Sequence, residues 1–221
     1  MDDPDGMTQI RTVDGRVAGR RGQATRTRLL ECLAEMLATT SYRDITVIDV
    51  ARMAGTSPAT FYQYFPDIQA AVLELANEVV RESAPLKELA TGRSWAGRSA
   101  TVAAGELVGG FLDFWRDHEA ILRVVDLAAA EGERRFSRLR MRLLNAVVGA
   151  LTEAIAELQH GGKVDADVLP AATAGALVTM LAAAASHTKA FESWSVRDAD
   201  LRTGLTRLVA QGVTGRKPTM A

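Results

Sequence analysis

The feature that most constrains this chain is a pair of short helical patterns within residues 46–65, separated by one glycine. The first pattern places apolar or small residues on one helix face, at Val47, Val50, Ala51 and Ala54. Thr46 precedes it as an N-cap, and Asp49 stands three residues on, where a capping-box partner belongs. Gly55 then ends the first helix, because glycine adopts a positive φ at little cost. The segment therefore predicts a short helix followed by a tight turn.

A second short helix is predicted directly after this turn. Ser57 is an N-cap residue, and Pro58 occupies the first helical position, where its missing N–H costs nothing. Phe61 and Phe65 mark the face turned toward the protein, and Pro66 ends the helix. Two short helices around a glycine turn are the geometry of a helix-turn-helix.

The outward face of the second helix is uncharged but rich in hydrogen-bonding groups. Ala59, Thr60 and Gln63 point outward, and Tyr62 and Tyr64 lie at its flanks. Hydroxyl groups can bind phosphates, a threonine methyl can contact thymine, and a glutamine amide can read adenine. We interpret this face as one that enters the major groove of duplex DNA; an ordinary helical hairpin with surface tyrosines is the alternative.

The charge distribution agrees with this interpretation. The formal net charge is −1, yet residues 10–65 carry eight arginines against five acidic residues. Residues 1–22 lack an apolar period, and we expect them to form a flexible basic arm with Arg11, Arg16, Arg20 and Arg21 in its second half. Such an arm either contacts phosphates or is a plain disordered tail.

The remainder of the chain is predicted to be helical, because no segment alternates as a strand does and aromatic residues make up only 5% of the chain. A first helix over 23–39 buries Leu29, Leu30, Leu33, Met36 and Leu37, with Cys32 as a small buried neighbour. Further helices are expected over 67–89, 100–116, 118–130, 133–159, 166–190 and 198–212. The fold class is thus all-α.

Several other classes of protein are disfavoured. Val168 to Thr188 is uncharged, but its alanines, Pro170 and polar residues favour a closely packed helix over a membrane span. The single cysteine and an N-terminus unlike a signal peptide favour a cytoplasmic protein. The three histidines lack metal-ligand spacing, and no catalytic or nucleotide-binding motif is present. We therefore expect no metal, no cofactor and no catalytic residue.

The stretch from Ile45 to Pro66 resembles the signature of TetR-type transcriptional regulators, most strongly in Ala54-Gly-Thr-Ser-Pro-Ala-Thr-Phe-Tyr-Gln-Tyr-Phe65. The resemblance covers about residues 24–75. It implies about nine helices, with a DNA-binding head here at 23–66 and a ligand-binding and dimerisation domain at 67–221. By position, it places DNA contacts on Thr46, Thr56, Ser57, Pro58, Ala59, Thr60, Tyr62, Gln63 and Tyr64. One departure is Ile68, which stands where the family commonly has a phosphate-binding lysine.

The larger C-terminal part is expected to hold a small apolar or aromatic effector. Candidate ligand-binding residues are Phe111, Phe114, Trp115, Leu122, Met141, Asn145, Met180 and His187, although each also suits ordinary packing or a structural hydrogen bond. The family pattern places homodimer contacts on the helices at 166–190 and 198–212. A twofold dimer would require a near-palindromic operator.

These expectations describe a DNA-binding transcriptional regulator, with a repressor favoured because occupancy alone blocks a promoter. Two alternatives stay open: an enzyme, and a helical ligand-binding or adaptor protein with a non-functional helix-turn-helix. The sequence does not identify the effector, the operator or the regulated genes.

Overall fold

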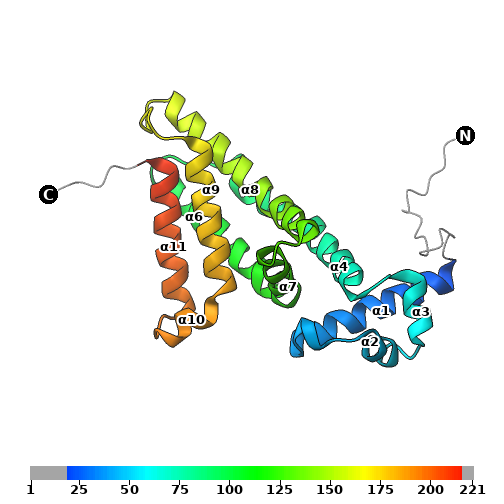
Figure 1. The fold of residues 1–221 in the computed structure, drawn as a ribbon. Helices are drawn as coiled ribbons and strands as arrows, with labels where there is room; N and C mark the ends of the chain where they lie inside the picture. The colour runs from blue at the N-terminus through cyan, green and yellow to red at the C-terminus, as the bar shows by residue number, and fades with distance from the viewer. Residues whose placement is uncertain (1–18, 216–221) are drawn as a thin grey trace, which may run out of the picture. The chain divides into compact units, whose positions relative to one another are not determined.

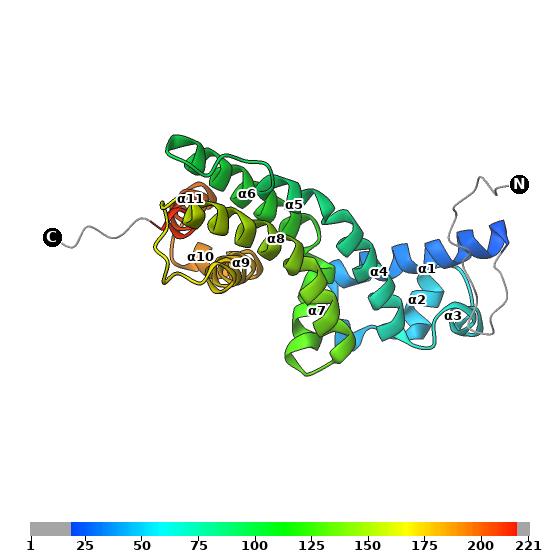
Figure 2. The same ribbon diagram turned by 90° about the horizontal axis from the view of Figure 1, so that it is seen from above.

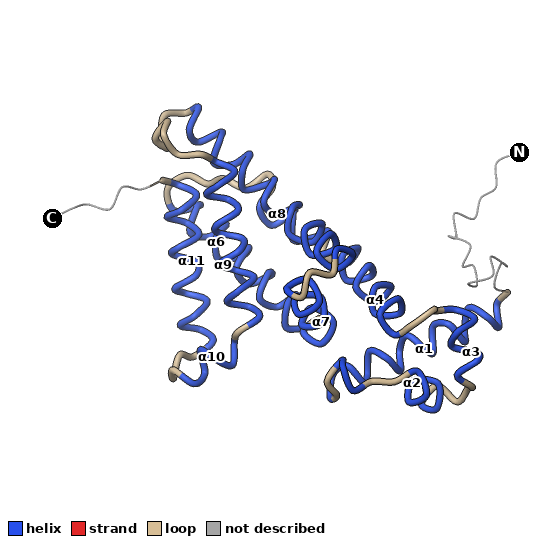
Figure 3. The backbone as a smooth tube through the Cα atoms, viewed as in Figure 1, coloured by secondary structure: helices blue, strands red, loops and turns tan. Residues whose placement is uncertain are grey.

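The computed structural model describes residues 19–215, where helices joined by loops make up the fold and no strand occurs (Figure 3). The expected arm at residues 1–22 lies mostly outside the described residues, including Arg11 and Arg16. Arg20 and Arg21 belong instead to the first helix, which begins three residues earlier than expected. The described residues divide into two compact units after Glu78, whereas we expected the domains to meet at residues 66 and 67.

The N-terminal unit contains α1 (Arg20–Thr39), the short 3-10 helix η1 (Tyr42–Asp44), α2 (Val47–Met53), α3 (Pro58–Tyr64) and the greater part of α4 (Ile68–Glu82) (Figure 1). The predicted apolar stripe of α1 is buried at its four leucines, while Met36 is half-buried. Cys32 is fully buried among them, and burial raises the pKa of its thiol. α4 contributes Ala71, Val72 and Ala76 to the buried residues. The first turns of α4 therefore belong to the compact N-terminal unit.

The C-terminal unit contains the end of α4 and the helices α5 (Ala84–Ala90), α6 (Arg98–Asp117), α7 (Glu119–Ala130), α8 (Arg134–His160), α9 (Pro170–Ser186), α10 (Thr188–Ser193) and α11 (Asp198–Thr214). α9 packs on α8, and α11 packs on both α6 and α9. α5 lies against α6 and α8 (Figure 2). These contacts form one helical bundle.

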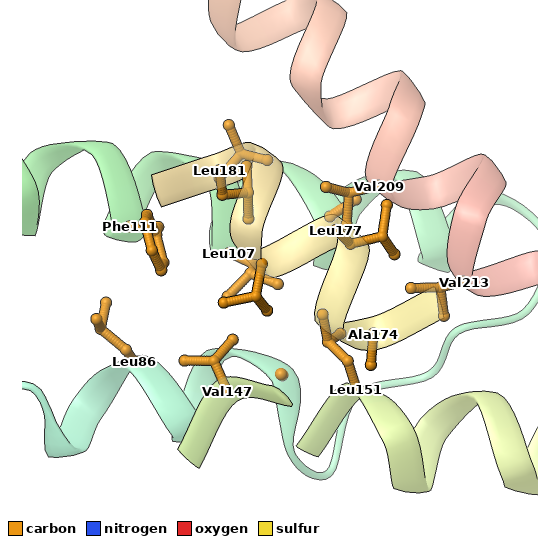
Figure 4. Close-up of a cluster of buried hydrophobic side chains, with 14 of the residues drawn as sticks. Leu86, Leu107, Phe111, Val147, Leu151, Ala174, Leu177, Leu181, Val209 and Val213 are labelled. Carbon is orange, nitrogen blue, oxygen red and sulfur yellow. The ribbon is translucent and has the colours of Figure 1, made fainter. Parts of the chain in front are cut away.

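A continuous apolar core fills the bundle. Figure 4 shows its centre, where side chains from α5, α6, α8, α9 and α11 meet: Leu86, Leu107, Phe111, Val147, Leu151, Ala174, Leu177, Leu181, Val209 and Val213. α9 and α11 approach closely at Gly212, which has no side chain. A Cβ added at Gly212 of α11 would lie 2.8 Å from Leu177 Cδ2 of α9. Small residues thus set the spacing of α9 and α11.

Two helices predicted as continuous are each broken in two. The helix expected over 67–89 is interrupted at Ser83, because Pro85 has no N–H and lies in the first turn of α5. The Ser83 hydroxyl donates a hydrogen bond to the Val80 carbonyl oxygen at 2.7 Å, which satisfies this buried polar group.

The helix expected over 166–190 begins later and ends earlier. α9 starts at Pro170, which suits a first helical position. His187 interrupts the helix with a ψ of 30°, and its Nδ1 lies 2.8 Å from the Ala183 carbonyl oxygen. Among the described helices, none has the length and apolar composition needed to cross a membrane.

Candidate DNA-binding interface

The first helix of the motif begins with the predicted cap. The Thr46 hydroxyl accepts a hydrogen bond from the Asp49 N–H at 3.2 Å, and Arg52 Nη2 pairs with Asp49 Oδ1 at 2.6 Å. These bonds satisfy one free amide at the start of α2 and position its exposed side. The capping prediction is confirmed.

The turn between α2 and α3 depends on Gly55. This residue has a φ of +67°, and its N–H donates to the Arg52 carbonyl at 3.1 Å. The Thr56 N–H donates to the Ala51 carbonyl at 2.9 Å. The two bonds form a Schellman motif, which fixes where α2 stops and in which direction the chain leaves it.

α3 begins at the next cap. The Ser57 hydroxyl accepts a hydrogen bond from the Thr60 N–H at 3.2 Å, and Pro58 occupies the first turn. The Ser57 and Thr60 hydroxyl oxygens lie 3.0 Å apart. Both hydroxyls therefore stand at the N-terminal end of α3, the end that faces base edges in a helix-turn-helix.

Buried aromatic and small residues hold α3 to the rest of its unit. Phe61 and Phe65 are buried, with ring centroids 5.4 Å apart, and Val50 and Ala51 of α2 are fully buried. Ala54 is half-buried. The side of α3 that carries the phenylalanines is therefore fixed in the core, which leaves the opposite side exposed.

The remaining predicted contact residues lie on or beside that exposed side. Pro58, Ala59, Tyr62 and Gln63 are exposed, and Thr60 and Tyr64 are half-buried. The Tyr62 ring packs edge-on against Phe61 at 6.0 Å between centroids, which restricts its orientation. The two cap residues, Thr46 and Ser57, are exposed, and Thr56 in the turn between the helices is half-buried. The predicted contacts on α3 and in the turn before it thus form an uncharged surface, whereas Thr46 stands at the start of α2 beside Asp49.

An arginine from α1 braces the end of α3. Arg26 Nη2 pairs with Glu74 Oε2 of α4 at 2.7 Å, and its guanidinium lies 5.1 Å from the centre of the Phe65 ring. The Arg26 side chain is mostly buried, with 17% of its surface exposed. One side chain therefore connects α1, α4 and the residue that ends α3, and it holds α3 in place without lying on the exposed side of that helix.

The candidate ligand-binding residues do not form one site. Phe111, Trp115 and Leu122 lie in the core, where Phe111 and Trp115 stack at 5.4 Å between centroids. Phe114 and Met180 are partly buried against that core. Asn145 is exposed on α8. Met141 and His187 are also exposed, but they line a common cavity.

That cavity lies between α7, α8 and α9 and has a volume of about 490 Å³. Its walls include Ala129, Ala130, Met141, Ala182 and Ala183. A polar network borders the alanines: Asp126 accepts hydrogen bonds from Arg140 Nε at 2.8 Å and from the Ser186 hydroxyl at 2.9 Å. We call this space the alanine cavity. It combines a mostly apolar wall with a few fixed polar groups, as ligand sites do.

Family comparisons agree with both units. Residues 29–75 match the model of bacterial regulatory proteins of the tetR family, and residues 86–220 match the tetracyclin repressor-like C-terminal domain. The second match alone covers more than half of the chain. This chain belongs to the tetR family.

Individual relatives show how far the likeness extends. The HTH-type transcriptional regulator EthR of Mycolicibacterium smegmatis is 34% identical over 77 residues, which span 34% of this chain and 36% of EthR. The match thus spans about a third of that relative's length.

Two solved structures share the tetR-family fold with most of this chain. The MbdR regulator of Azoarcus sp. CIB has a TM-score of 0.63 at 17% identity, covering 85% of this chain and 98% of MbdR. FadR of Bacillus subtilis, in complex with stearoyl-CoA, has a TM-score of 0.63 at 15% identity, covering 86% of this chain and 99% of FadR. At these identities the likeness concerns the fold alone.

One departure from the tetR-family pattern lies where α4 begins. Asp67 caps α4 by accepting a hydrogen bond from the Ala70 N–H at 2.6 Å. Ile68 follows it and is half-buried, so this position carries no cation for a phosphate. Arg20 is exposed at the start of α1 and has no ion pair within residues 19–215.

Sequence reasoning missed two groups of residues. Arg26 and Glu74 are 48 positions apart, and only the fold brings them together. The Asp126–Arg140–Ser186 network joins three helices, and neither Asp126 nor Ser186 stands out in the sequence. A charged residue within an apolar helix face is the single available signal, and Arg140 shows it.

Proposed function

We propose that this chain is a sequence-specific DNA-binding transcriptional regulator that binds a near-palindromic operator as a homodimer. The observation that carries the proposal is the division of α3 into two sides. Phe61 and Phe65 fix one side in the core, while Gln63 and Tyr62 on the other are exposed and uncharged. A helix held in this way can present hydrogen-bonding groups to base edges without rearranging.

The contacts expected on DNA follow from the caps and the exposed side of α3. Thr46, Thr56, Ser57 and Tyr64 are placed to bind phosphates through their hydroxyl groups. We expect Ala59 and Thr60, next to Pro58, to contact thymine methyl groups, and Gln63 to read adenine. Because α3 carries no charge, phosphate binding through cations falls to arginines outside it, including those at residues 11, 16, 20 and 21.

The proposed dimer uses α9 and α11, in keeping with the family pattern. Both helices expose small residues, including Ala176 of α9 and Gly204 of α11. Leu208 is also exposed, with half of its surface accessible. Two copies of this pair would form a four-helix interface and place two α3 helices on one face of the DNA.

We place the effector in the alanine cavity, and we propose a small apolar or aromatic molecule. Met141 and His187, both candidates from the sequence, line it, and the Asp126–Arg140–Ser186 network supplies polar contacts. FadR of Bacillus subtilis is in complex with stearoyl-CoA, and the apolar acyl chain of that ligand supports a partly apolar effector for this fold. Effector binding would shift α4, which crosses from one unit into the other, and lower operator affinity by about 5–150-fold.

Selection of duplex DNA from a randomised pool by the full-length protein tests the DNA-binding proposal. We expect enrichment of an inverted repeat whose half-sites are separated by about one helical turn, roughly 34–36 Å, or a multiple of it. A helical adaptor with a non-functional helix-turn-helix would enrich no sequence. That result would refute the proposed function.

Repression and effector release are tested on the selected operator. A reporter promoter carrying the operator should lose expression when the protein is present. Apolar and aromatic compounds that restore expression should also release the protein from the operator in solution. A compound that binds the free protein and its DNA complex equally well would contradict the release mechanism.

A further inference from the structure

A second cavity lies in the C-terminal unit and shares no residue with the alanine cavity. It has a volume of about 400 Å³, within the range of small-ligand sites. Its lining residues include Leu158 near the end of α8 and Thr214 at the end of α11, and these two helices finish at the same end of the bundle (Figure 1). It is lined by Trp95, Ala96, Gly97, Ala100, Thr101, Leu158, Lys163, Arg207, Ala210, Gln211 and Thr214. We call it the end pocket.

The charged residues that line the end pocket are both positive. Lys163 follows α8, and Arg207 belongs to α11. Within residues 19–215, neither side chain has an ion pair or hydrogen bond. No carboxylate lines the pocket. Two like charges beside one hollow repel each other, and an anion placed between them would be attracted by both.

Three arginines elsewhere in this unit are paired with carboxylates. Arg202 Nη2 lies 2.7 Å from Asp113 Oδ1, Arg140 Nε lies 2.8 Å from Asp126 Oδ1, and Arg93 Nη1 lies 2.9 Å from Glu106 Oε2. The cations of the end pocket have no such partner among the described residues.

The remaining walls suit an organic anion better than an inorganic ion. Trp95 is buried, and its indole N–H already donates to the Ala90 carbonyl at 3.2 Å, so the ring is a fixed wall. Ala100, Leu158 and Ala210 extend the apolar surface. Gln211 and Thr101 supply uncharged hydrogen-bonding groups. A ligand with an aromatic or other apolar body and one acidic group would use both kinds of wall.

We propose that the end pocket binds a small organic anion through Lys163 and Arg207, with the body of the ligand against Trp95. The acidic group is a carboxylate, phosphate or sulfonate, since all three accept charge-assisted hydrogen bonds. The site is separate from the proposed effector cavity and does not depend on DNA binding.

Fluorescence of anilinonaphthalene sulfonate, an aromatic sulfonate, provides the test with the full-length protein in the absence of DNA. The pocket variant carries Lys163→Gln and Arg207→Gln. The matched control carries Lys87→Gln and Lys189→Gln, which remove the same charge from exposed positions of the same unit. We expect the pocket variant to bind the dye about tenfold or more weakly and the control to bind it as the wild type does.

Competition with the dye by other small molecules shows whether the pocket recognises the acidic group or the apolar body of a ligand, and which acidic group it prefers. Benzoate and phenyl phosphate should displace the dye from the wild type, with the better competitor identifying the preferred group, while neutral benzyl alcohol should not. Unchanged far-UV circular dichroism would show that the variants fold. Equal weakening in pocket and control variants, no effect of the pocket substitutions, or equal competition by benzyl alcohol would each overturn the proposal.

Discussion

At the scale of single residues, the helix-turn-helix depends on positions where a backbone conformation or a cap has one good solution. Thr46 and Ser57 each accept a hydrogen bond from an amide three residues on. Gly55 adopts a positive φ that residues with a Cβ rarely adopt. These positions were predictable because capping and turn chemistry are local in sequence.

Gly55→Ala tests the turn. An added Cβ would meet nothing within 4 Å, so the cost is backbone strain alone, about 1 kcal/mol. Gly149→Ala is the matched control, because Gly149 lies within α8 and its added Cβ also meets nothing within 4 Å. We expect the control to stabilise the protein by up to about 1 kcal/mol. Urea unfolding followed by circular dichroism measures both, and a stabilising effect of Gly55→Ala would contradict the account of the turn.

At the scale of elements, helix existence was predicted better than helix continuity. Apolar periodicity indicates each helix, but it continues across Ser83 and His187, where the chain leaves the helical conformation. Pro85 is a local signal that explains the first break. The second depends on His187 Nδ1 reaching the Ala183 carbonyl, which no periodicity reveals. Contacts between elements, such as Arg26 with Glu74 and Phe65, depend on the fold.

Arg26→Gln tests how α3 is held. The substitution removes the ion pair with Glu74 and the contact with the Phe65 ring, so we expect operator affinity to fall about fivefold through loss of positioning. Its effect should be the same at low and high salt, because Arg26 does not touch phosphate. Arg28→Gln, on the same helix and half-exposed, is the control and should change affinity less. A salt-dependent loss in Arg26→Gln would show a direct DNA contact instead.

Asp113 makes the contact of α6 with α11 sensitive to acid. A hydrogen bond from Arg202 holds the pKa of Asp113 below its usual 3.8, against the opposing effect of desolvation. Asp113 therefore binds a proton more tightly in the unfolded chain than in the folded protein. Its interaction with Arg202 stabilises the fold above about pH 4, and this stabilisation is lost as the pH falls through the lowered pKa.

Asp113→Asn should consequently be less stable than the wild type at neutral pH, and this difference should shrink below about pH 4. The difference will be modest, because about half of the Asp113 side chain is exposed. Asp117→Asn, a more exposed neighbour, is the control. Unfolding free energies measured across this pH range check the prediction; a constant difference would contradict it.

At the scale of the whole molecule, the all-α fold and the position of the DNA-binding motif followed from the sequence, whereas the ligand sites did not. The motif is a contiguous segment whose chemistry is local. A cavity is instead bounded by residues from several helices, and core packing produces the same apolar patterns. Phe111 and Trp115 illustrate this, since they stack in the core while the exposed Met141 lines the alanine cavity.

The most direct test of the account is the base preference of Gln63→Ala on the selected operator, with Asn145→Ala, an exposed amide on α8, as the control. If α3 reads bases, Gln63→Ala should lower affinity for the operator by about 1–3 kcal/mol and relax the preference at one base pair of each half-site, while binding to unrelated DNA is unchanged. The control should leave both affinities unchanged. A double variant, Gln63→Ala with Tyr64→Ala, provides the contrary outcome. If it kept both the operator affinity and the base preference of the wild type, the claim that α3 lies in the major groove would be contradicted.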